Sequence, residues 1–512
     1  MKKALVSVYN KNEKLLEFVS FLIEKKYKII STNGTYQYLL KNGLHTIEIS
    51  SITSFPDILD GRIKTIHPYI YGGILVNRSN KKQIKSIKNY NIDLIDIVLT
   101  DFYPFIEKIK NKSIDIKSMI EFIDIGGPSL LRSAAKNFLY VTPIIDINDF
   151  KLIKNEIEEN KSISIKIRKK LAGKAFNFTS NYDAVISNYL LKEEKFPTYI
   201  NFSYKKKMNL IYGENPHQKA AFYINNIQKG AMCNINQLHG NPISFNNIKD
   251  MDIAWKIISQ FSPNIPTCCT VKHSTPCGVA NGKDIIEAFQ KTYYADPISS
   301  FGGVIAFNTK VTEKLAKEIN RIFLEVVIAS DYDKKAINIL KMKKSLRTII
   351  INNSISDITE CVQVDGGFLM QETDYSLNKK EEDSYKIVTE KKFSDQEIKS
   401  LFFAQKVVKY VKSNAIVIAK GTQTLGISGG QTNRIWAARQ AINRALKKNK
   451  KGLVLVSDAF FPFRDVVDEA AQSKCICAIL QPGGSIRDEE SIKACNSYGI
   501  AMAFTGKRYF KH

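Results

Sequence analysis

The segment TVKHSTPCGVANG, residues 270–282, places Lys272 and His273 side by side after an apolar run. Histidine has a reference pKa near neutrality and can serve as a general base, while an ammonium group stabilises developing negative charge. The sequence predicts a strand that ends at this pair, because Pro276 and Gly278 are expected to break it. The pair is therefore either catalytic or part of a solvated strand end.

Three loops in the first part of the chain also have residue types suited to phosphate or proton chemistry. STNGT, residues 31–35, presents backbone N–H groups at a helix start, which suits a phosphate. GRIKTIHP, residues 61–68, gathers four polar or basic side chains, namely Arg62, Lys64, Thr65 and His67. IDIGGPSLLRSAAKN, residues 123–137, puts Asp124 before a helix start and Lys136 within that helix. Each loop also has a plain structural interpretation as a β–α turn, a strand end or a helix cap.

Alternating strand and helix patterns position these loops. Strands are predicted within residues 3–10, 28–35 and 92–105, with a helix over residues 12–27. Such a series typically forms a parallel sheet that binds ligands at the carboxyl ends of its strands. A long helix is predicted over residues 162–191. A charged, Pro-containing stretch follows it, and we expect a domain boundary near residue 197.

Length and composition indicate a globular protein of two or three domains. The chain has 512 residues, of which 44% are hydrophobic, and its apolar runs are far shorter than the ~18 residues of a membrane span. The N-terminus lacks a secretory pattern, so a cytoplasmic location without membrane association is expected. Eight cysteines without a C-x-x-C pair and six scattered histidines indicate free thiols and no metal site.

The net charge of +25 raises the question of nucleic-acid binding. The lysines are spread along the chain among Ile and Asn residues, however, and aromatic–basic stacking motifs are absent. An anionic small molecule is therefore a better expectation than nucleic acid.

Ten motifs in order along the chain resemble one known family. They are STNGT, GRIKTIHP, FYPF, IDIGGPSLLRSAAKN, YGENPHQ, VKHSTPCG, DPISSFGG, VDGG, SDAFFPFRD and QPGGSIRD. This combination resembles the bifunctional purine-biosynthesis family, which joins an IMP cyclohydrolase to a transformylase acting on 5-aminoimidazole-4-carboxamide ribonucleotide (AICAR). The resemblance runs from residue 4 to residue 512.

The resemblance implies an α/β fold in two parts. Residues 1–196 are expected to form a methylglyoxal-synthase-like parallel-sheet domain with cyclohydrolase activity. Residues 197–512 are expected to form the transformylase domain from two similar, cytidine-deaminase-like α/β subdomains. A zinc deaminase needs a P-C-x-x-C motif, whereas PCGVA supplies only Cys277, so the zinc should be missing.

The resemblance also implies the chemistry of the two sites. The transformylase moves a formyl group from 10-formyltetrahydrofolate to the AICAR amine, with His273 as base and Lys272 as cation. The cyclohydrolase closes the ring with loss of water, at a site lined by Lys64, Tyr103, Asp124 and Lys136. Family members are homodimers with transformylase sites at the subunit interface. No catalytic metal is implied, and a structural potassium ion is left open.

Further residues match positions that the family uses to bind substrates. Those expected around the cyclohydrolase nucleotide are Lys11, Ser31, Gly34, Thr35, Arg62 and Thr65. Those expected near AICAR or folate are Tyr212, Asn215, His217, Asn414, Arg434, Phe461, Arg508 and His512.

Five positions depart from the family pattern. Four are moderate changes, at Asn33, Tyr71, Asp101 and Thr275. The largest is Ile211, which stands where an arginine normally precedes YGENPHQ. A chain that has lost one activity and serves as a binding or scaffold protein is the alternative. Retention of the five residues expected to carry catalysis, Lys64, Asp124, Lys136, Lys272 and His273, argues against it.

Overall fold

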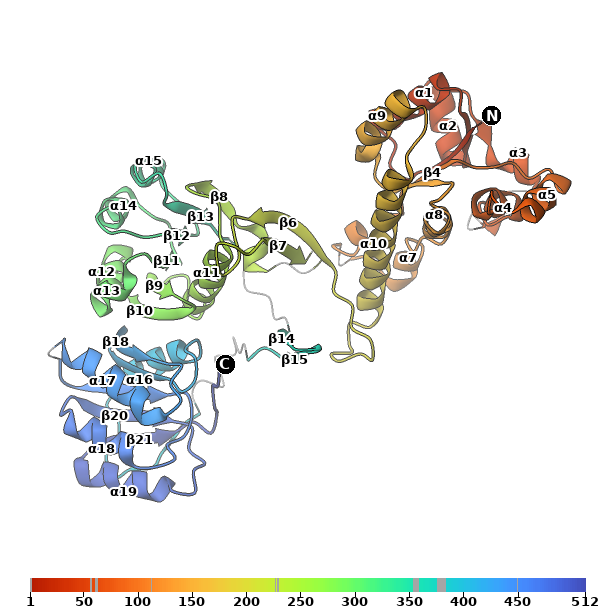
Figure 1. The fold of residues 1–512 in the computed structure, drawn as a ribbon. Helices are drawn as coiled ribbons and strands as arrows, with labels where there is room; N and C mark the ends of the chain where they lie inside the picture. Colours follow the sequence, from red (N-terminus) through yellow and green to blue (C-terminus); the bar gives the residue numbers. More distant parts are fainter. Residues whose placement is uncertain are drawn as a thin grey trace. The chain divides into compact units, whose positions relative to one another are not determined.

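A computed structural model of the protein describes residues 2–55, 58–59, 63–111, 113–225, 227, 230–352, 359–374, 384–448 and 450–512. The chain forms two compact units, unit 1 from Met1 to Tyr204 and unit 2 from Lys205 to His512 (Figure 1). The boundary expected near residue 197 lies shortly before the end of unit 1.

Unit 1 is built around a parallel five-stranded sheet in the order β3-β2-β1-β4-β5. Its strands are β1 (Lys3–Ser7), β2 (Lys28–Ser31), β3 (Ile47–Glu48), β4 (Ile97–Thr100) and β5 (Thr142–Ile144). The central strands are apolar and buried on both faces, as expected for a parallel sheet covered by helices. The predicted parallel sheet is thus confirmed.

Helices cover both faces of this sheet. They are α1 (Glu13–Glu24), α2 (Asn33–Lys41), α3 (Ile49–Thr53), α4 (Pro68–Leu75), α5 (Lys81–Asn89), α6 (Phe105–Lys108), α7 (Ile116–Ile120), α8 (Gly126–Lys136), α9 (Phe150–Asn160) and α10 (Ile165–Leu190), with a 3-10 turn, η2 (Ile147–Asp149). Successive residues of β1 serve opposite layers, because strand side chains alternate. Val6 packs in the layer of α1 and α9, whereas Leu5 packs with α4 and α8. The long helix predicted over residues 162–191 is confirmed as α10.

The strand order places three loops at one edge of the unit 1 sheet. Strands β1, β2 and β4 run parallel, so their carboxyl ends at Ser7, Ser31 and Thr100 lie side by side. The chain order reverses between β1 and β4, and ligands of open α/β sheets bind at such a point.

Unit 2 contains one twelve-stranded mixed sheet in the order β16-β21-β20-β19-β17-β18-β10-β9-β11-β12-β13-β8. The strands are β8 (Asn236–His239), β9 (Thr267–Lys272), β10 (Thr275–Asn281), β11 (Val304–Phe307), β12 (Val326–Ala329), β13 (Arg347–Ile350), β16 (Lys386–Ile387), β17 (Ile416–Lys420), β18 (Gln423–Ser428), β19 (Leu453–Ser457), β20 (Ile476–Gln481) and β21 (Ala501–Phe504). Two separate strand pairs are β6 (Tyr204–Leu210) with β7 (Ala220–Asn225), and β14 (Glu360–Val364) with β15 (Gly367–Gln371).

The helices of unit 2 follow the strands in two similar series. They are α11 (Phe245–Ile258), α12 (Ile285–Ala295), α13 (Pro297–Ser300), α14 (Glu313–Ile319), α15 (Lys334–Leu340), α16 (Asp395–Val408), α17 (Arg434–Leu446), α18 (Asp465–Gln472) and α19 (Asp488–Tyr498), with a 3-10 turn, η3 (Ala231–Asn234). No helix in the described part of the chain is long and apolar enough to cross a membrane.

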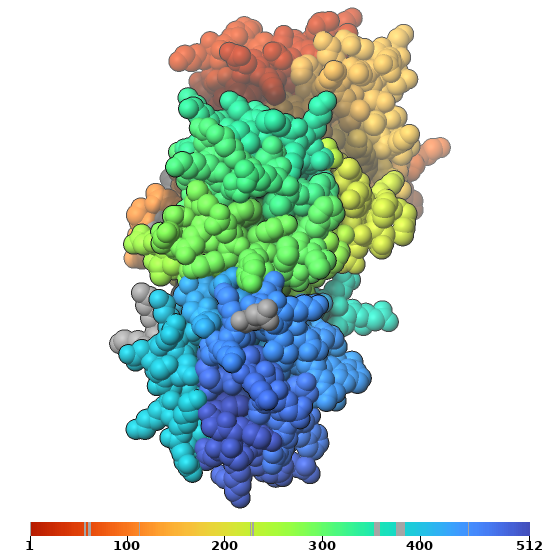
Figure 2. Space-filling view, turned by 90° about the vertical axis from the view of Figure 1, so that its left-hand side faces the viewer, coloured from red at the N-terminus to blue at the C-terminus, as the bar shows by residue number. Residues whose placement is uncertain are grey.

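Unit 2 is a structural duplication. Read inward from its two edges, the sheet gives β8-β13-β12-β11-β9-β10 and β16-β21-β20-β19-β17-β18, with the same parallel and antiparallel pairings in the same places. We call the part from β8 to β13 the first half and the part from β16 to β21 the second half. They join where β10 pairs antiparallel with β18, and Figure 2 shows them in contact, in green and in cyan to blue. The duplicated arrangement expected for this domain is therefore present.

The strand expected to break at Pro276 and Gly278 does not break there. Both residues lie inside β10, and the chain reverses earlier, at His273 and Ser274. A β-bulge between Pro276 and Gly278 accommodates the proline. Gly278 is required because helix α12 passes so closely that an added Cβ would lie 2.5 Å from the carbonyl oxygen of Thr292. The first strand does end at Lys272, as predicted. The expected break at Pro276 and Gly278 was wrong, because a bulge and a close helix use the same residue types as a turn.

Candidate active sites

The first candidate site lies at the carboxyl edge of the unit 1 sheet, where the loops after β1 and β4 meet. The carboxylate of Asp101 accepts hydrogen bonds from the backbone N–H groups of Tyr9 and Asn10, at 2.9 Å for the latter. The ring of Tyr9 packs edge-on against that of Tyr103, with centroids 5.7 Å apart. Asp101, which replaces a usual asparagine, therefore ties the β1 loop to the β4 loop.

Asp124 is a half-buried carboxylate at this site. Its carboxylate accepts hydrogen bonds from the N–H groups of Gly127 at 2.9 Å and Tyr103 at 3.3 Å. Burial raises the pKa of this carboxyl, which the backbone hydrogen bonds and, more weakly, the charge of Lys64 oppose. The nearby charge of Asp101 raises the Asp124 pKa further. A carboxyl group whose pKa is raised by burial is a candidate for proton transfer.

The residues expected around the nucleotide gather beside the start of α2. Thr35 is buried, and its hydroxyl bridges to the N–H and C=O of Val8 at 3.1 and 3.2 Å. The ammonium of Lys11 lies 4.0 Å from the position of a Cβ on Gly34. Thr32, the cap of α2, forms no side-chain bond to the first helical turn, so that turn can serve an anion. Ser31 is buried and donates to Thr46 at 3.1 Å, so it supports this pocket.

The remaining predicted residues of unit 1 are placed unevenly. The Thr65 hydroxyl lies against Gly126, 2.8 Å from a Cβ built there, and so joins the Asp124 group. Lys136 is exposed in the last turn of α8, about 15 Å along the helix axis from its first residue. The structure does not bring Lys136 to Asp124. Arg62 lies outside the described residues.

The second candidate site begins at the β9–β10 turn of unit 2. His273 and Ser274 form a two-residue turn, with φ of 54° and 57°. Left-handed φ at both positions normally favours glycine or asparagine. Asp250 on α11 holds the turn, because its carboxylate accepts from the N–H groups of His273 at 3.2 Å and Ser274 at 2.6 Å. Burial raises the Asp250 pKa, against the effect of those two hydrogen bonds.

Lys272 and Cys277 flank this turn. The ammonium of Lys272 donates to the carbonyl of Phe301 at 2.7 Å, which fixes it beside the histidine. Burial raises the pKa of the Cys277 thiol to about 12, so this group stays protonated and unreactive. The base and the cation, rather than the thiol, are available for chemistry.

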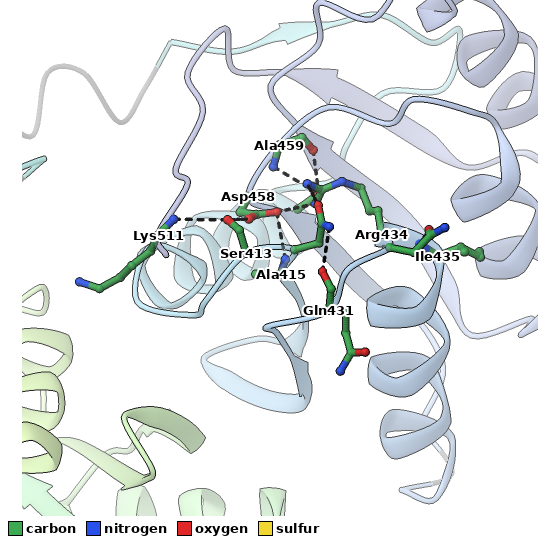
Figure 3. A network of polar contacts seen from close by, with 11 residues as sticks. Ser413, Ala415, Gln431, Arg434, Ile435, Asp458, Ala459 and Lys511 are labelled. Carbon is green, nitrogen blue, oxygen red and sulfur yellow. Dashed lines mark hydrogen bonds and ion pairs between the residues drawn. The ribbon is translucent and has the colours of Figure 1, made fainter. Parts of the chain in front are cut away.

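A buried polar network occupies the start of β17 in the second half. Arg434 donates to Asp458, to Ser457 at 2.8 Å and to the Asn414 side-chain oxygen at 2.6 Å (Figure 3). Asp458, which is fully buried, also accepts from Ser413 and from the N–H of Ala415. The network fixes the direction of the Asn414 amide.

The C-terminal tail is tied to the same network. The N–H of Tyr509 donates to the carbonyl of Asp458 at 2.8 Å, and the N–H of Ser413 donates to the carbonyl of Lys511 at 2.8 Å. Within the tail, Arg508 stacks on the ring of Phe510 at 4.3 Å. Phe510 in turn packs edge-on against His512, with ring centroids 5.5 Å apart. The tail thereby carries two predicted binding residues to the Arg434 network.

The YGENPHQ loop docks on α11, the helix that carries Asp250. Glu214 forms an ion pair with Lys249 at 2.8 Å, and its backbone carbonyl accepts from Asn246 at 3.1 Å. The hydrogen bond from Lys249 and its charge lower the Glu214 pKa, and Lys412, just before the Arg434 network, contributes further. This loop therefore lies near residues of both halves.

The turn and the network share one edge of the unit 2 sheet. Because β10 and β18 pair antiparallel, the start of β10 is level with the end of β18 and the start of β17. Strands lie about 4.8 Å apart, so the turn and Asn414 are separated by roughly 12 Å across the sheet.

Three other predicted residues of unit 2 are either buried in an apolar core or exposed. Phe461 is fully buried in an apolar core. Asn215 and His217 are exposed, although the Asn215 amide is 3.3 Å from the Gln218 side chain. Ile211 is 51% exposed, so it does not face a core.

Sequence reasoning missed the two carboxylates that hold these groups, Asp250 and Asp458. Asp458 lies within the SDAFFPFRD motif, so its position after a buried strand was a usable signal. Asp250 sits inside a helix, and nothing local to it indicates that it reaches a turn of the adjacent hairpin.

Comparison with known proteins identifies the family. A profile described as AICARFT/IMPCHase bienzyme matches residues 134–444, and one described as an MGS-like domain matches residues 14–129. Proteins named bifunctional purine biosynthesis protein PurH are similar over the full length of both chains: 51% identical in Clostridium botulinum strain Eklund 17B, and 52% in Clostridium beijerinckii and Fusobacterium nucleatum. The solved structure of ForH is 28% identical, covers 37% of this chain and 98% of its own, and has a TM-score of 0.34. The chain belongs to the AICARFT/IMPCHase bienzyme family.

Proposed function

We propose that this chain catalyses the last two steps of IMP synthesis at separate sites. Unit 2 transfers a formyl group from 10-formyltetrahydrofolate to AICAR, and unit 1 closes the ring of the product with loss of water. Family membership supports both activities. The observation that best supports the formyl-transfer site is the Lys272–His273 pair, held on a two-residue turn by the half-buried carboxylate of Asp250.

In the transformylase step, the AICAR amine is a poor nucleophile because its lone pair is conjugated with the imidazole ring. His273 accepts the amine proton as the nitrogen attacks the formyl carbon. Lys272 stabilises the negative charge that develops on the formyl oxygen. The nitrogen of the folate then leaves with a proton, which gives tetrahydrofolate and formyl-AICAR. Asn414, with its amide direction fixed by Arg434, is suited to hold the carboxamide.

In the cyclohydrolase step, the carboxamide nitrogen of formyl-AICAR attacks the formyl carbon. Asp124 takes a proton from that nitrogen and returns it to the formyl oxygen, a role that its raised pKa favours. The formamide N–H supplies the second proton as water leaves and the ring C=N bond forms. Lys64 and the Tyr103 hydroxyl are proposed to steady the formyl oxygen. The first turn of α2, with Lys11, is proposed to hold the nucleotide phosphate. The role of Lys136 stays a prediction, because that residue lies at the other end of α8.

Further features rest on the family rather than on the structure of this chain. We infer a homodimer whose transformylase sites lie at the subunit interface, and a cytoplasmic enzyme. Neither proposed step uses a metal ion. A structural potassium ion is a separate question, which activity measured in sodium and in potassium salts addresses.

Separation of the two activities by mutation tests the proposal. His273→Ala should lower formyl transfer at least about 100-fold and leave ring closure of supplied formyl-AICAR intact. Asp124→Asn should do the reverse, because the two proposed sites lie in different units of the chain and share no residues. Equal slowing of both steps by His273→Ala would contradict the two-site proposal. Wild-type protein without formyl transfer would favour the scaffold alternative.

A further inference from the structure

The β17–β18 turn of the second half stands at the same place in the fold as the His273 turn, although only the first of its two residues has a positive φ. Lys420 occupies the position of Lys272, and Gly421, with φ of 58°, occupies that of His273. The ammonium of Lys420 donates to the carbonyl of Lys451 at 2.7 Å, and Gly452 follows that carbonyl with φ of 68°.

The first half has the same bond. Lys272 donates at 2.7 Å to the carbonyl of Phe301, and Gly302 follows that carbonyl with φ of 72°. The lysine of each turn is therefore fixed in the same way. Because β10 and β18 are antiparallel, the two turns lie at opposite edges of the sheet.

Three more lysines gather beside the β17–β18 turn. The ammonium groups of Lys448 and Lys450 lie 4.4 and 5.6 Å from the centroid of one ring, that of Tyr294. Lys450 also donates to the side-chain oxygen of Gln423 at 3.4 Å, and the Gln423 amide donates to the carbonyl of Lys291 at 2.8 Å. These contacts hold the lysines against the turn rather than leaving them free in solvent.

Positive charge at this cluster is poorly balanced. Burial, followed by the charges of Lys420, Lys291 and Lys448, lowers the pKa of Lys450. Within the described ranges, a single ion pair reaches these four lysines, from Glu287 to Lys291 at 3.1 Å. Like charges held together repel one another, and a bound anion relieves that repulsion.

We propose that Lys420, Lys448 and Lys450 form a second, non-catalytic site of unit 2 that binds an anion carrying two or more phosphate groups. Three ammonium groups without acidic partners can balance the negative charge of two or more phosphate groups. Lysine commonly binds phosphate, as a point charge. The site cannot repeat the proposed formyl-transfer chemistry, because Gly421 offers no base where the other turn offers His273. This site is independent of the proposed function, since it rests on the duplication and on the lysine contacts.

Calorimetric titration of the full chain with tripolyphosphate tests this site. AICAR is kept saturating, so that the proposed nucleotide sites are occupied. The double variant Lys420→Gln/Lys450→Gln is compared with Lys341→Gln/Lys344→Gln, a control pair of exposed lysines on the first half. The site predicts binding by wild type and control that is about tenfold or more weaker in the first variant. Added salt should weaken wild-type binding.

The controls separate this site from the transformylase site. Both double variants should retain wild-type formyl transfer and wild-type circular dichroism. A parallel titration with ATP distinguishes a nucleotide from a bare polyphosphate as the source of the phosphates. Equal affinity in the two variants, or no binding by the wild type, would overturn the site. Loss of formyl transfer in Lys420→Gln/Lys450→Gln would overturn its non-catalytic character.

Discussion

The two halves of unit 2 have a two-residue hairpin turn at the same position, but the turns differ in backbone conformation and in the side chain that holds them. In the first half, Asp250 accepts from two backbone N–H groups of a turn that carries His273. In the second, Ser400 accepts from one N–H, that of Gly421, at 2.8 Å. Asp250 and Ser400 are both the sixth residue of their helices, α11 and α16. Thus a carboxylate with two acceptor oxygens holds the turn that contains His273, a residue that disfavours left-handed φ. A single hydroxyl holds the turn that contains glycine.

The starts of the central strands show the opposite division. Asn308 and Asp458 each follow the strand next to the hairpin. Asn308 accepts from the first backbone N–H of β9 at 2.8 Å, and Asp458 accepts from the N–H just before β17 at 3.1 Å. Only Asp458 also pairs with an arginine, because the first residue of α17 is Arg434 whereas that of α12 is Ile285.

The antiparallel β10–β18 junction explains why this division is useful. It brings the turn of the first half and the strand start of the second half to the same sheet edge. At this edge, the first half presents the His273 turn and the second half presents the Arg434–Asp458 network. The corresponding positions at the opposite edge have Gly421 and Asn308. The duplication therefore places the polar groups of both halves at one edge of the sheet, rather than as two equal sets at opposite edges.

The largest effect is expected from unpairing the buried charge of the second half. Arg434→Met leaves Asp458 fully buried without its cation, which should lower the free energy of unfolding by about 3–5 kcal/mol. The matched control is Arg464→Met, which removes the exposed Arg464–Asp468 pair and should change stability by about 1 kcal/mol or less. Urea denaturation measures both, and similar small losses would contradict the role of the network.

The next largest effect is expected when Asp250 is replaced by serine, the residue type that holds the turn of the second half. Asp250→Ser leaves one N–H of the His273 turn without its acceptor, so the histidine should lose its fixed position. We expect kcat for formyl transfer to fall about 10-fold to 100-fold, because small displacements of catalytic groups slow reactions by such factors. Ser400→Ala, at the matching position, should leave kcat unchanged. Equal effects of the two changes on kcat would show that the turns do not differ in function.

The sequence predicted the fold class and much of the candidate chemistry, but not the contacts that organise it. Alternating patterns and ten motifs were sufficient for the parallel sheet of unit 1, helix α10 and the Lys272–His273 pair. The sequence did not reveal that Pro276 and Gly278 sit in a bulged strand, since a turn uses the same residue types. Asp250 was missed because its partner turn is remote in sequence, and recognising it needs the packing of α11 on β9.

A tenfold effect is expected at Ile211, which lies next to the YGENPHQ loop. Its side chain is 51% exposed, and the nearby Lys207 is committed to the carbonyls of Cys233 and Ile235 at 2.7 and 3.2 Å. Ile211→Arg should add a cation for the AICAR phosphate and lower KM about tenfold with little change in kcat. Steady-state kinetics with varied AICAR measure this, with Ile211→Gln as the uncharged control. An unchanged KM would mean that another cation already binds the phosphate.

The smallest effect concerns the glycine of the second turn. Gly421→Ala forces a side chain into left-handed φ, with no atom within 4 Å of the new Cβ, so the cost is conformational. We expect a loss of about 0.5–1 kcal/mol in unfolding free energy. Formyl transfer should stay at the wild-type rate. A drop in that rate would indicate that the second turn also serves the reaction.

The most direct test of the central claim, that the first turn serves formyl transfer and the second does not, is His273→Gly. This change gives the first turn the residue of the second, so the backbone is relaxed while the base is removed. We predict that formyl transfer falls at least about 100-fold. The free energy of unfolding should stay the same or rise by up to about 1 kcal/mol. Retained formyl transfer, or a clear loss of stability, would contradict the account.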